Sequence, residues 1–248
     1  MSTLLYRGAP IGGAYTGGNI QALVAEATGN AKTGPALTLW ILPATDNGET
    51  PLSVLQRDGW RSTCGDCPHQ ASSCYTSPGA SQTLSAGAAS IVKGISCGPV
   101  KVSRKVKRAR SAAFGDIAAL PLHVVQAWRD LRASHGLAPL GYTHSWRTRP
   151  DLRDDHMASV ETEDGAREAR EAGWRYFRVR PVGAPLLAGE VQCPATDTAG
   201  RKNPIDCNRC GLCDGLTRGA HRPSVSIEDH GPQAKRTARH ASSLSIAS

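Results

Sequence analysis

The sequence predicts an α/β fold, built as a partial or full barrel of parallel strands with cysteine-bearing loops at the strand carboxyl ends. Residues 37–42 form a short apolar run closed by Pro43, as expected of a buried strand. Strand-like and helix-like segments then alternate from residue 121 to residue 227. Such alternation implies parallel strands joined by right-handed crossovers, which an open doubly wound sheet would also satisfy.

The residues before this strand are expected to form a separate N-terminal segment, residues 1–36. Residues 20–27, Ile-Gln-Ala-Leu-Val-Ala-Glu-Ala, have a helix-like composition. Residues 29–34 resemble a phosphate loop but lack the order G-x-x-x-x-G-K-[ST], which favours a simple loop before a strand. The α/β metal-binding domain is expected to span residues 37–230, and residues 231–248 to be a disordered basic tail.

Two helices are predicted within the alternation. The first begins near Pro121 and ends at Gly136, with apolar residues at helical spacing between them. The second begins after Thr162, a capping residue, and ends at Gly173. Its narrow inner face is expected to consist of Ala166, Ala169 and Ala172.

Further strands are expected at residues 140–146, 157–160, 174–179 and 224–227. In parallel α/β folds ligands bind beyond the carboxyl ends of the strands. This rule selects Asp116, His144, Ser159, Glu161, Arg178, Arg180 and Glu228, and it predicts that both cysteine groups lie on that side. Of these residues, His144, Glu161 and Arg178 are the candidate catalytic residues.

The composition is that of an ordinary soluble chain with eight cysteines. Mean hydropathy is −0.33, and the sequence contains neither a membrane-spanning apolar run nor a recognisable export signal. A cytoplasmic location is therefore expected. In a reducing compartment, thiols two residues apart are metal ligands or redox pairs more often than structural disulfides.

The first cysteine group consists of Cys64, Cys67 and Cys74. Three thiols leave either an open coordination position or a fourth ligand from elsewhere, for which His69 and Cys97 are candidates. An iron without a thiolate could bind substrate or cofactor, whereas a structural zinc completed by His69 is the alternative. Cys97, which has no close neighbour in sequence, is otherwise interpreted as a bystander.

The second cysteine group consists of Cys193, Cys207, Cys210 and Cys213. The last three follow the spacing C-x₂-C-x₂-C, which puts three thiolates on one short loop, as in bacterial ferredoxins. Cys193 could supply the fourth ligand. The pattern predicts a metal site, and either a 4Fe–4S cluster or a Cys₄ zinc site could use these residues.

A net charge of +8 raises the question of a polyanionic partner. One basic run contains Lys101, Arg104, Lys105, Lys107, Arg108 and Arg110, and three more cations lie in the tail. Aromatic content is only 5%, so no stacking platform for single strands is evident. A solvated basic segment is the favoured interpretation, with nucleic-acid contact through residues 101–110 as the alternative.

Several segments together resemble an uncharacterised family of phage and prophage proteins, over roughly residues 28–230. They are Cys64-Gly-Asp-Cys67-Pro-His, Cys74-Tyr75, Phe114-Gly115-Asp116, Gly141-Tyr-Thr-His-Ser-Trp146, Met157-Ala-Ser-Val160, Gly173-Trp174-Arg-Tyr-Phe-Arg178 and Cys193-Pro-Ala. This resemblance implies a phage-encoded protein in the host cytoplasm and no particular activity.

More distantly, the layout resembles radical S-adenosylmethionine enzymes. These place a three-cysteine cluster loop after the first strand of a partial barrel and a glycine-rich acidic motif after the second. The resemblance implies that Gly115 and Asp116 bind the cofactor S-adenosylmethionine and that the second cysteine group holds an auxiliary cluster. The family spacing is C-x₃-C-x₂-C, whereas here two and then six residues separate the thiols.

Three hypotheses follow. The first is an iron–sulfur protein of radical-enzyme-like architecture acting on an unknown substrate. The second is a zinc-stabilised protein that binds nucleic acid or a host factor through its basic segment. The third, which ranks lowest because no H-E-x-x-H pair is present, is a zinc hydrolase using His144, Glu161 or Glu228.

Overall fold

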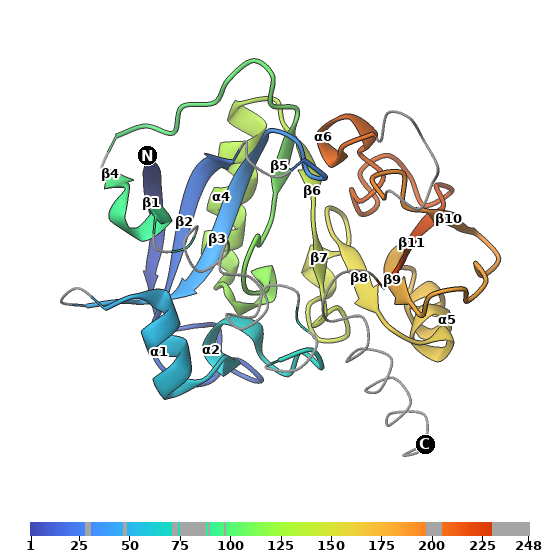
Figure 1. The fold of residues 1–248 in the computed structure, drawn as a ribbon, viewed down its shortest axis with the longest axis horizontal. Helices are drawn as coiled ribbons and strands as arrows, with labels where there is room; N and C mark the ends of the chain where they lie inside the picture. Colours follow the sequence, from blue (N-terminus) through green and yellow to red (C-terminus); the bar gives the residue numbers. More distant parts are fainter. Residues whose placement is uncertain are drawn as a thin grey trace.

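The computed structural model describes residues 1–27, 31–46, 49–70, 74, 88, 90–96, 98–196 and 205–229. It is a mixed α/β structure with two mostly parallel sheets and helices packed on them (Figure 1), so the predicted fold class is confirmed at this level. The predicted tail, Cys97 and Tyr75 lie outside the described residues. No helix in the described ranges has the length and apolar character needed to cross a bilayer.

The first sheet has the strand order β4-β1-β2-β3-β5-β6. Only β2 runs antiparallel to its neighbours β1 and β3, whereas β4 is parallel to β1, and β5 is parallel to both β3 and β6. Its strands are β1 (Ser2–Gly8), β2 (Ile20–Ala27), β3 (Ala36–Pro43), β4 (Ile95–Ser96), β5 (Arg108–Arg110) and β6 (Ala138–Leu140).

The second sheet is entirely parallel, with the order β10-β11-β9-β8-β7. Its strands are β7 (Tyr142–Thr143), β8 (Met157–Val160), β9 (Tyr176–Arg180), β10 (Glu190–Gln192) and β11 (Ser224–Glu228). Gly141 alone separates β6 from β7, and a Cβ there would lie 2.7 Å from the ring of His156. The chain therefore passes from one sheet to the other through a glycine, and β3, β5, β6–β7, β8, β9 and β11 follow one another side by side in chain order.

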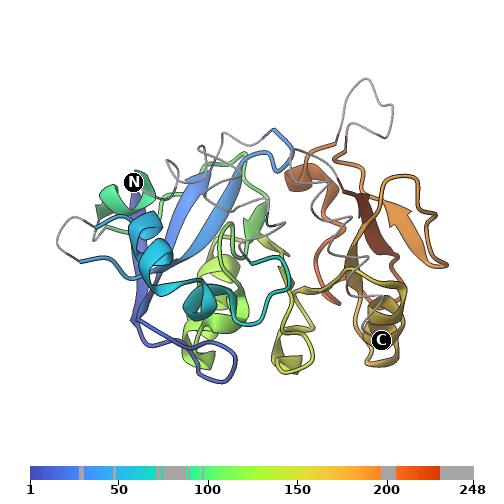
Figure 2. The same ribbon diagram turned by 60° about the horizontal axis from the view of Figure 1, so that its bottom comes forward.

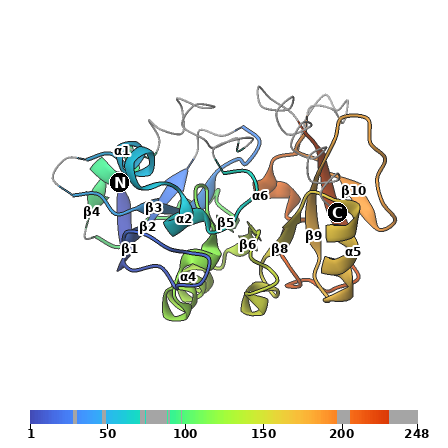
Figure 3. The same cartoon turned by 90° about the horizontal axis from the view of Figure 1, so that it is seen from below.

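Helices cover the sheets according to the alternation of side chains along the strands. Leu37, Leu39 and Ile41 of β3 face the core between the first sheet and α4 (Leu122–Ser134). The same core continues between the second sheet and α5 (Glu163–Glu171). Figure 3 shows α4 and α5 on the same side of the two sheets. Trp40 and Leu42 face the opposite side, where α1 (Pro51–Asp58) packs. This two-sided burial explains why β3 is apolar except at Thr38.

The face of the second sheet opposite α5 is covered by the cysteine-bearing connection between β10 and β11. Leu140, Met157 and Val225 pack there against Cys193 and Cys213. Figure 2 shows the second sheet and this connection on one side of the molecule, with β1–β3 on the other. The remaining short elements are α2 (Arg61–Cys64), α6 (Cys207–Cys210) and the 3₁₀ turns η1 (Ile117–Ala119) and η2 (Pro150–Leu152).

Several predicted elements are confirmed. Helices α4 and α5 form as expected, and the hydroxyl of Thr162 caps α5 by accepting the Gly165 N–H at 3.0 Å. The helix-like interpretation of residues 20–27 is wrong, because this segment pairs with β1 and β3 along its length. Ala172 is also not part of the buried face of α5, since it is exposed just beyond the last helical residue.

Candidate metal centres

The first cysteine group lies in a tightly turned loop at the end of α2. The Cys67 N–H donates to the Cys64 carbonyl at 3.1 Å, and the Cys74 N–H donates to the His69 carbonyl at 3.0 Å. The Asp116 N–H donates to the Thr63 carbonyl at 2.8 Å, which joins this loop to the segment after β5. The group thus lies at the carboxyl ends of β3 and β5, as predicted.

All seven described cysteines are free thiols. Burial raises the pKa of the Cys64 thiol, and the nearby Cys67, Cys74 and Asp116 raise it further. The three thiols are therefore close enough to repel one another as thiolates. A bound cation would remove this cost, because metal binding releases the thiol protons and compensates the negative charge.

Gly115 and Asp116 hold this end of the molecule together. At Gly115 φ is +77°, and a Cβ would lie 2.6 Å from the backbone oxygen of Ile41. Asp116 is only 5% exposed, and both of its carboxylate oxygens accept backbone hydrogen bonds at 2.9 Å, from Ala118 and from His144. Its carboxylate therefore fixes the start of η1 and the residue that follows β7.

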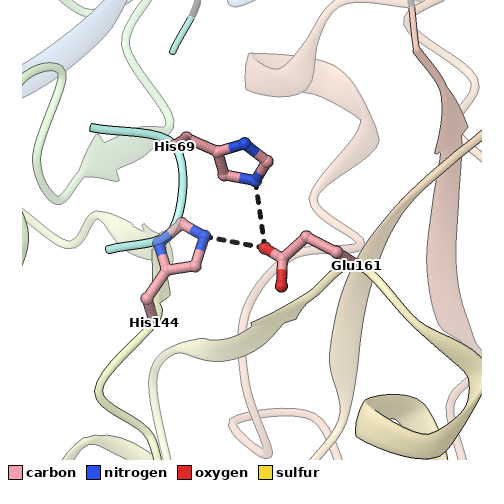
Figure 4. Close-up of side chains that lie close together, drawn as sticks. All are labelled: His69, His144 and Glu161. Carbon is pink, nitrogen blue, oxygen red and sulfur yellow. Dashed lines mark hydrogen bonds and ion pairs between the residues drawn. The ribbon is translucent and has the colours of Figure 1, made fainter. Parts of the chain in front are cut away.

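Next to the first group, two histidines and a glutamate converge on one point (Figure 4). Nε2 of His69 lies 3.2 Å from Oε1 of Glu161, and Nε2 of His144 lies 3.0 Å from the same oxygen. The other carboxylate oxygen points away from both rings. These are the only three metal-ligating side chains in the described part of the chain whose ligand atoms all lie within 4.8 Å of one another.

The electrostatics of this cluster are strongly coupled. Burial alone would lower the pKa of His144, but hydrogen bonds to Cys67 and Glu161 raise it well above its usual value. Burial alone would raise the pKa of Glu161, but hydrogen bonds from His144 and His69 hold it well below its usual range. The carboxylate is therefore charged, and Cys67 connects this cluster to the first cysteine group.

Sequence reasoning missed one side chain at this end, Tyr15. Its hydroxyl lies 2.7 Å from Oγ of Ser145, and its ring lies against Gly65. Burial and the nearby Asp116 raise its pKa, with a further contribution from Cys64. Tyr15 lies in a glycine-rich turn between β1 and β2, and no motif there distinguishes it.

Arg178, a candidate catalytic residue, is engaged in the fold. Its side chain is 3% exposed, and its guanidinium donates to both oxygens of Glu190 at 2.7 Å. Arg180 similarly pairs with Glu228 at 2.8 Å. These ion pairs link β9 to β10 and β11, so both arginines have structural partners within the second sheet. Ser159 is half-buried in β8 and precedes the site by two residues.

Helix α6 of the second cysteine group does not share the end of the strands occupied by the first group. The Cys207 N–H donates to the Lys32 carbonyl at 2.9 Å and the Asn208 N–H to Thr33 at 3.0 Å, and both acceptors precede β3. The prediction that both groups lie at the strand carboxyl ends is therefore wrong for α6. The physical reason is connectivity: a chain joining two parallel strands must return to the amino end of the next strand, here β11.

The loop of the second group is held by specific contacts. Asp206 caps α6 by accepting the Arg209 N–H at 2.8 Å, and Gly211 ends it with φ +64°. The buried Arg175, just before β9, donates to the carbonyl of Leu212 at 2.7 Å and to Asp214 at 2.8 Å. These contacts fix Cys207, Cys210 and Cys213 on one short curl.

The four thiols of the second group influence one another. Burial raises the pKa of Cys207 to about 12, and Cys193 and Cys210 contribute to the increase. Burial also raises the pKa of Cys213, and the other three thiols add to that effect. Lys32 and Arg110 act in the opposite direction on Cys193 and Cys207, respectively. Arg110, the last residue of the basic run, therefore lies near this group.

The four thiols of the second group lie close enough to influence one another. Four thiolates could hold one zinc ion, or each could bind a different iron of an iron–sulfur cluster.

Comparison with family models, with curated proteins and with solved structures finds no significant match to this chain. Its function is therefore inferred from the chemistry and arrangement of its own residues.

Proposed function

We propose that the chain is an iron–sulfur protein with the architecture of a radical S-adenosylmethionine enzyme, phage-encoded and acting on an unidentified substrate. One observation supports this most strongly. The parallel strands β3, β5, β6–β7, β8, β9 and β11 lie side by side in chain order, with β4 and β10 at the outer edges. The three-thiol loop lies between β3 and β5, and Gly115-Asp116 follows shortly after β5. This is the order in which such enzymes carry their cluster loop and their cofactor motif.

The number and grouping of the thiols support metal centres. In both groups the thiols are close enough to raise the pKa of a neighbour. The first group offers three thiols, which would leave one iron of a 4Fe–4S cluster without a thiolate.

Gly115 and Asp116 support the loop that would hold the cluster. A cluster with such an iron supplies an electron for cleavage of the cofactor sulfonium. Cys64, Cys67 and Cys74 would hold the cluster. Gly115 permits the close approach of the β5 loop to β3, and Asp116 orients His144 beside Cys67. In this proposal His144 and Glu161 border the substrate space.

The test is anaerobic purification followed by quantification of iron, acid-labile sulfide and zinc, with visible and electron paramagnetic resonance spectra. We expect a brown protein with iron and sulfide. Cys64→Ala should lose one cluster, Cys210→Ala should lose the other, and Cys97→Ala, which changes a cysteine outside both groups, should lose neither. With a reductant, the wild type should cleave S-adenosylmethionine and Cys64→Ala should not.

Colourless protein with stoichiometric zinc and no iron after reconstitution would overturn the proposal. The second candidate, a zinc-stabilised protein that binds nucleic acid, would then lead. Lys101, Arg104, Lys105 and Lys107 are exposed and available for phosphate contacts. Four such contacts predict that the logarithm of the duplex-DNA binding constant falls with the logarithm of salt concentration with a slope of about −3.6. Replacing these four residues with Gln should abolish this salt dependence.

A further inference from the structure

We propose that His69, His144 and Glu161 form a binding site for one divalent transition-metal ion, beside the first cysteine group but with no thiol among its ligands. The ligand set would be two imidazole nitrogens and one carboxylate oxygen. Such a set suits Zn²⁺ and Fe²⁺ and leaves coordination positions open for water or substrate. This proposal goes beyond the iron–sulfur function and does not require it.

The ligand atoms of His69, His144 and Glu161 converge on one point. Both Nε2 atoms lie within 3.2 Å of the same carboxylate oxygen, and all three ligand atoms lie within 4.8 Å of one another. The rings are inclined at 65° with their centroids 5.6 Å apart, so they do not stack. Two histidines from distant parts of the chain that direct the same ring nitrogen at one point form half of a coordination sphere (Figure 4).

Ordered elements of the fold hold His144 and Glu161 in place. His144 directly follows β7, and its N–H is held by Asp116 at 2.9 Å. Glu161 directly follows β8 and immediately precedes Thr162, the cap of α5. Two of the three ligands are therefore fixed by ordered elements on neighbouring parallel strands. Sites supported in this way position their ligands more accurately than sites on loops alone.

The cluster carries a carboxylate that a cation would neutralise, and it is accessible from solvent. Without a cation, a negatively charged carboxylate uses one oxygen for two imidazoles. A divalent ion between the three groups would let each donate a lone pair to the metal. The side chains of His69, His144 and Glu161 are 14%, 26% and 22% exposed, respectively. The cluster is thus shielded but still reachable by an ion from solvent.

Cobalt is a suitable probe because its X-ray absorption edge is separate from that of iron. Protein purified anaerobically, with its native metals retained, would be incubated with Co²⁺, freed of unbound ion, and assayed for cobalt content and cobalt-edge fine structure. We expect one cobalt per chain with only nitrogen and oxygen neighbours. Zn²⁺ and Fe²⁺ should displace it in competition.

Loss of a group that only hydrogen-bonds to a metal ligand typically weakens metal binding by roughly 10–100-fold. Glu161→Gln and His144→Ala each remove a ligand, so each should weaken cobalt binding by more than that. Glutamine keeps a neutral hydrogen-bond acceptor, so Glu161→Gln should remain folded, and its circular dichroism and thermal midpoint would verify this. Glu163→Gln and His135→Ala, which alter exposed residues of the same types nearby on the chain, should bind cobalt normally.

Unchanged cobalt binding in folded Glu161→Gln or His144→Ala would overturn the proposal. So would a sulfur neighbour of cobalt that disappears in Cys67→Ala, because the ion would then belong to the first cysteine group. The iron–sulfur proposal fails separately: Cys74→Ala and Cys210→Ala should change iron and sulfide content while leaving this nitrogen- and oxygen-ligated cobalt in place.

Discussion

Gly115 shows how a single residue controls the first candidate centre. Its left-handed backbone costs an L residue about 1–2 kcal/mol. A Cβ would also lie 2.6 Å from the Ile41 carbonyl oxygen, and overpacking of that kind costs about 1–3 kcal/mol more. We therefore expect Gly115→Ala to destabilise the protein by about 3 kcal/mol in urea unfolding, and to lower occupancy of the first cysteine group by displacing Asp116.

Gly136 provides the matched control. It also has a positive φ, +62°, but a Cβ there would meet no atom within 4 Å. Gly136→Ala should therefore cost only the left-handed penalty of about 1–2 kcal/mol and leave metal content unchanged. Equal destabilisation by the two substitutions would contradict the close approach of the β5 loop to β3.

Individual residues of the candidate site were predictable from sequence, but their meeting point was not. His144 and Glu161 follow from the rule that functional side chains lie after parallel strands, and His69 follows from its position in the cysteine loop. Their convergence depends on the loop after α2 folding across the ends of β7 and β8. No local pattern encodes that approach, and the same is true of Tyr15.

Among the elements, β9 supports a prediction about the candidate Arg178. Its partner Glu190 has a side chain that is 0% exposed, whereas the Arg180 partner Glu228 is 22% exposed. Breaking a buried ion pair leaves an uncompensated charge and costs about 3–5 kcal/mol. Glu190→Gln should therefore lower the free energy of unfolding by about 3 kcal/mol. Glu228→Gln should lower it by clearly less, because its carboxylate is more exposed. A similar loss in both would show that burial of the pair is unimportant.

A second prediction at this scale concerns the attachment of α4 to the turn before β8. Asp155 is buried and accepts hydrogen bonds from Arg129 at 2.8 and 2.9 Å and from His156 at 2.8 Å. Burial alone would raise its pKa, but these partners hold the pKa well below its usual range. At pH 7 we expect Asp155→Asn to cost about 3 kcal/mol, and Asp154→Asn, an exposed neighbour, to cost little.

The stability lost in Asp155→Asn should depend on pH and be smaller in acid. A carboxyl group whose folded pKa is depressed stabilises the protein fully above its unfolded pKa, which is about 3.9 for Asp. The wild type loses this contribution as pH falls from the unfolded pKa through the lower folded pKa of Asp155. Urea unfolding at several pH values should therefore show the Asp155→Asn deficit shrinking below about pH 4. A deficit that grew in acid would contradict the ion-pair explanation.

One element shows why local propensity misled the sequence interpretation. Residues 20–27 contain alanine, glutamine and glutamate, which favour helices, yet they form β2 because β1 and β3 pair on both sides. Long-range pairing decided this outcome, whereas the capped helix α5 and the mostly apolar strand β3 carried enough local information.

For the whole molecule, the second cysteine group connects the two sheets. Its loop bonds through Cys207 and Asn208 to the residues before β3, and the Cys213 carbonyl accepts the N–H of Gly141, the residue between the sheets. If the group binds a metal centre, part of the binding free energy contributes to this connection, because metal binding is coupled to folding.

Cys210→Ala should therefore raise amide hydrogen exchange selectively. We expect faster exchange at residues 190–193, 205–216 and 224–228 and around Gly141, and unchanged exchange in β1, whose partners are β2 and β4. Cys64→Ala, which removes a thiol at the opposite end of the strands, should instead loosen residues 60–70 and the turn at Asp116. Uniform acceleration across both sheets in either variant would mean that the centres stabilise the fold globally. The separation of the two patterns thus tests whether this chain contains two independent metal centres at opposite ends of its strands.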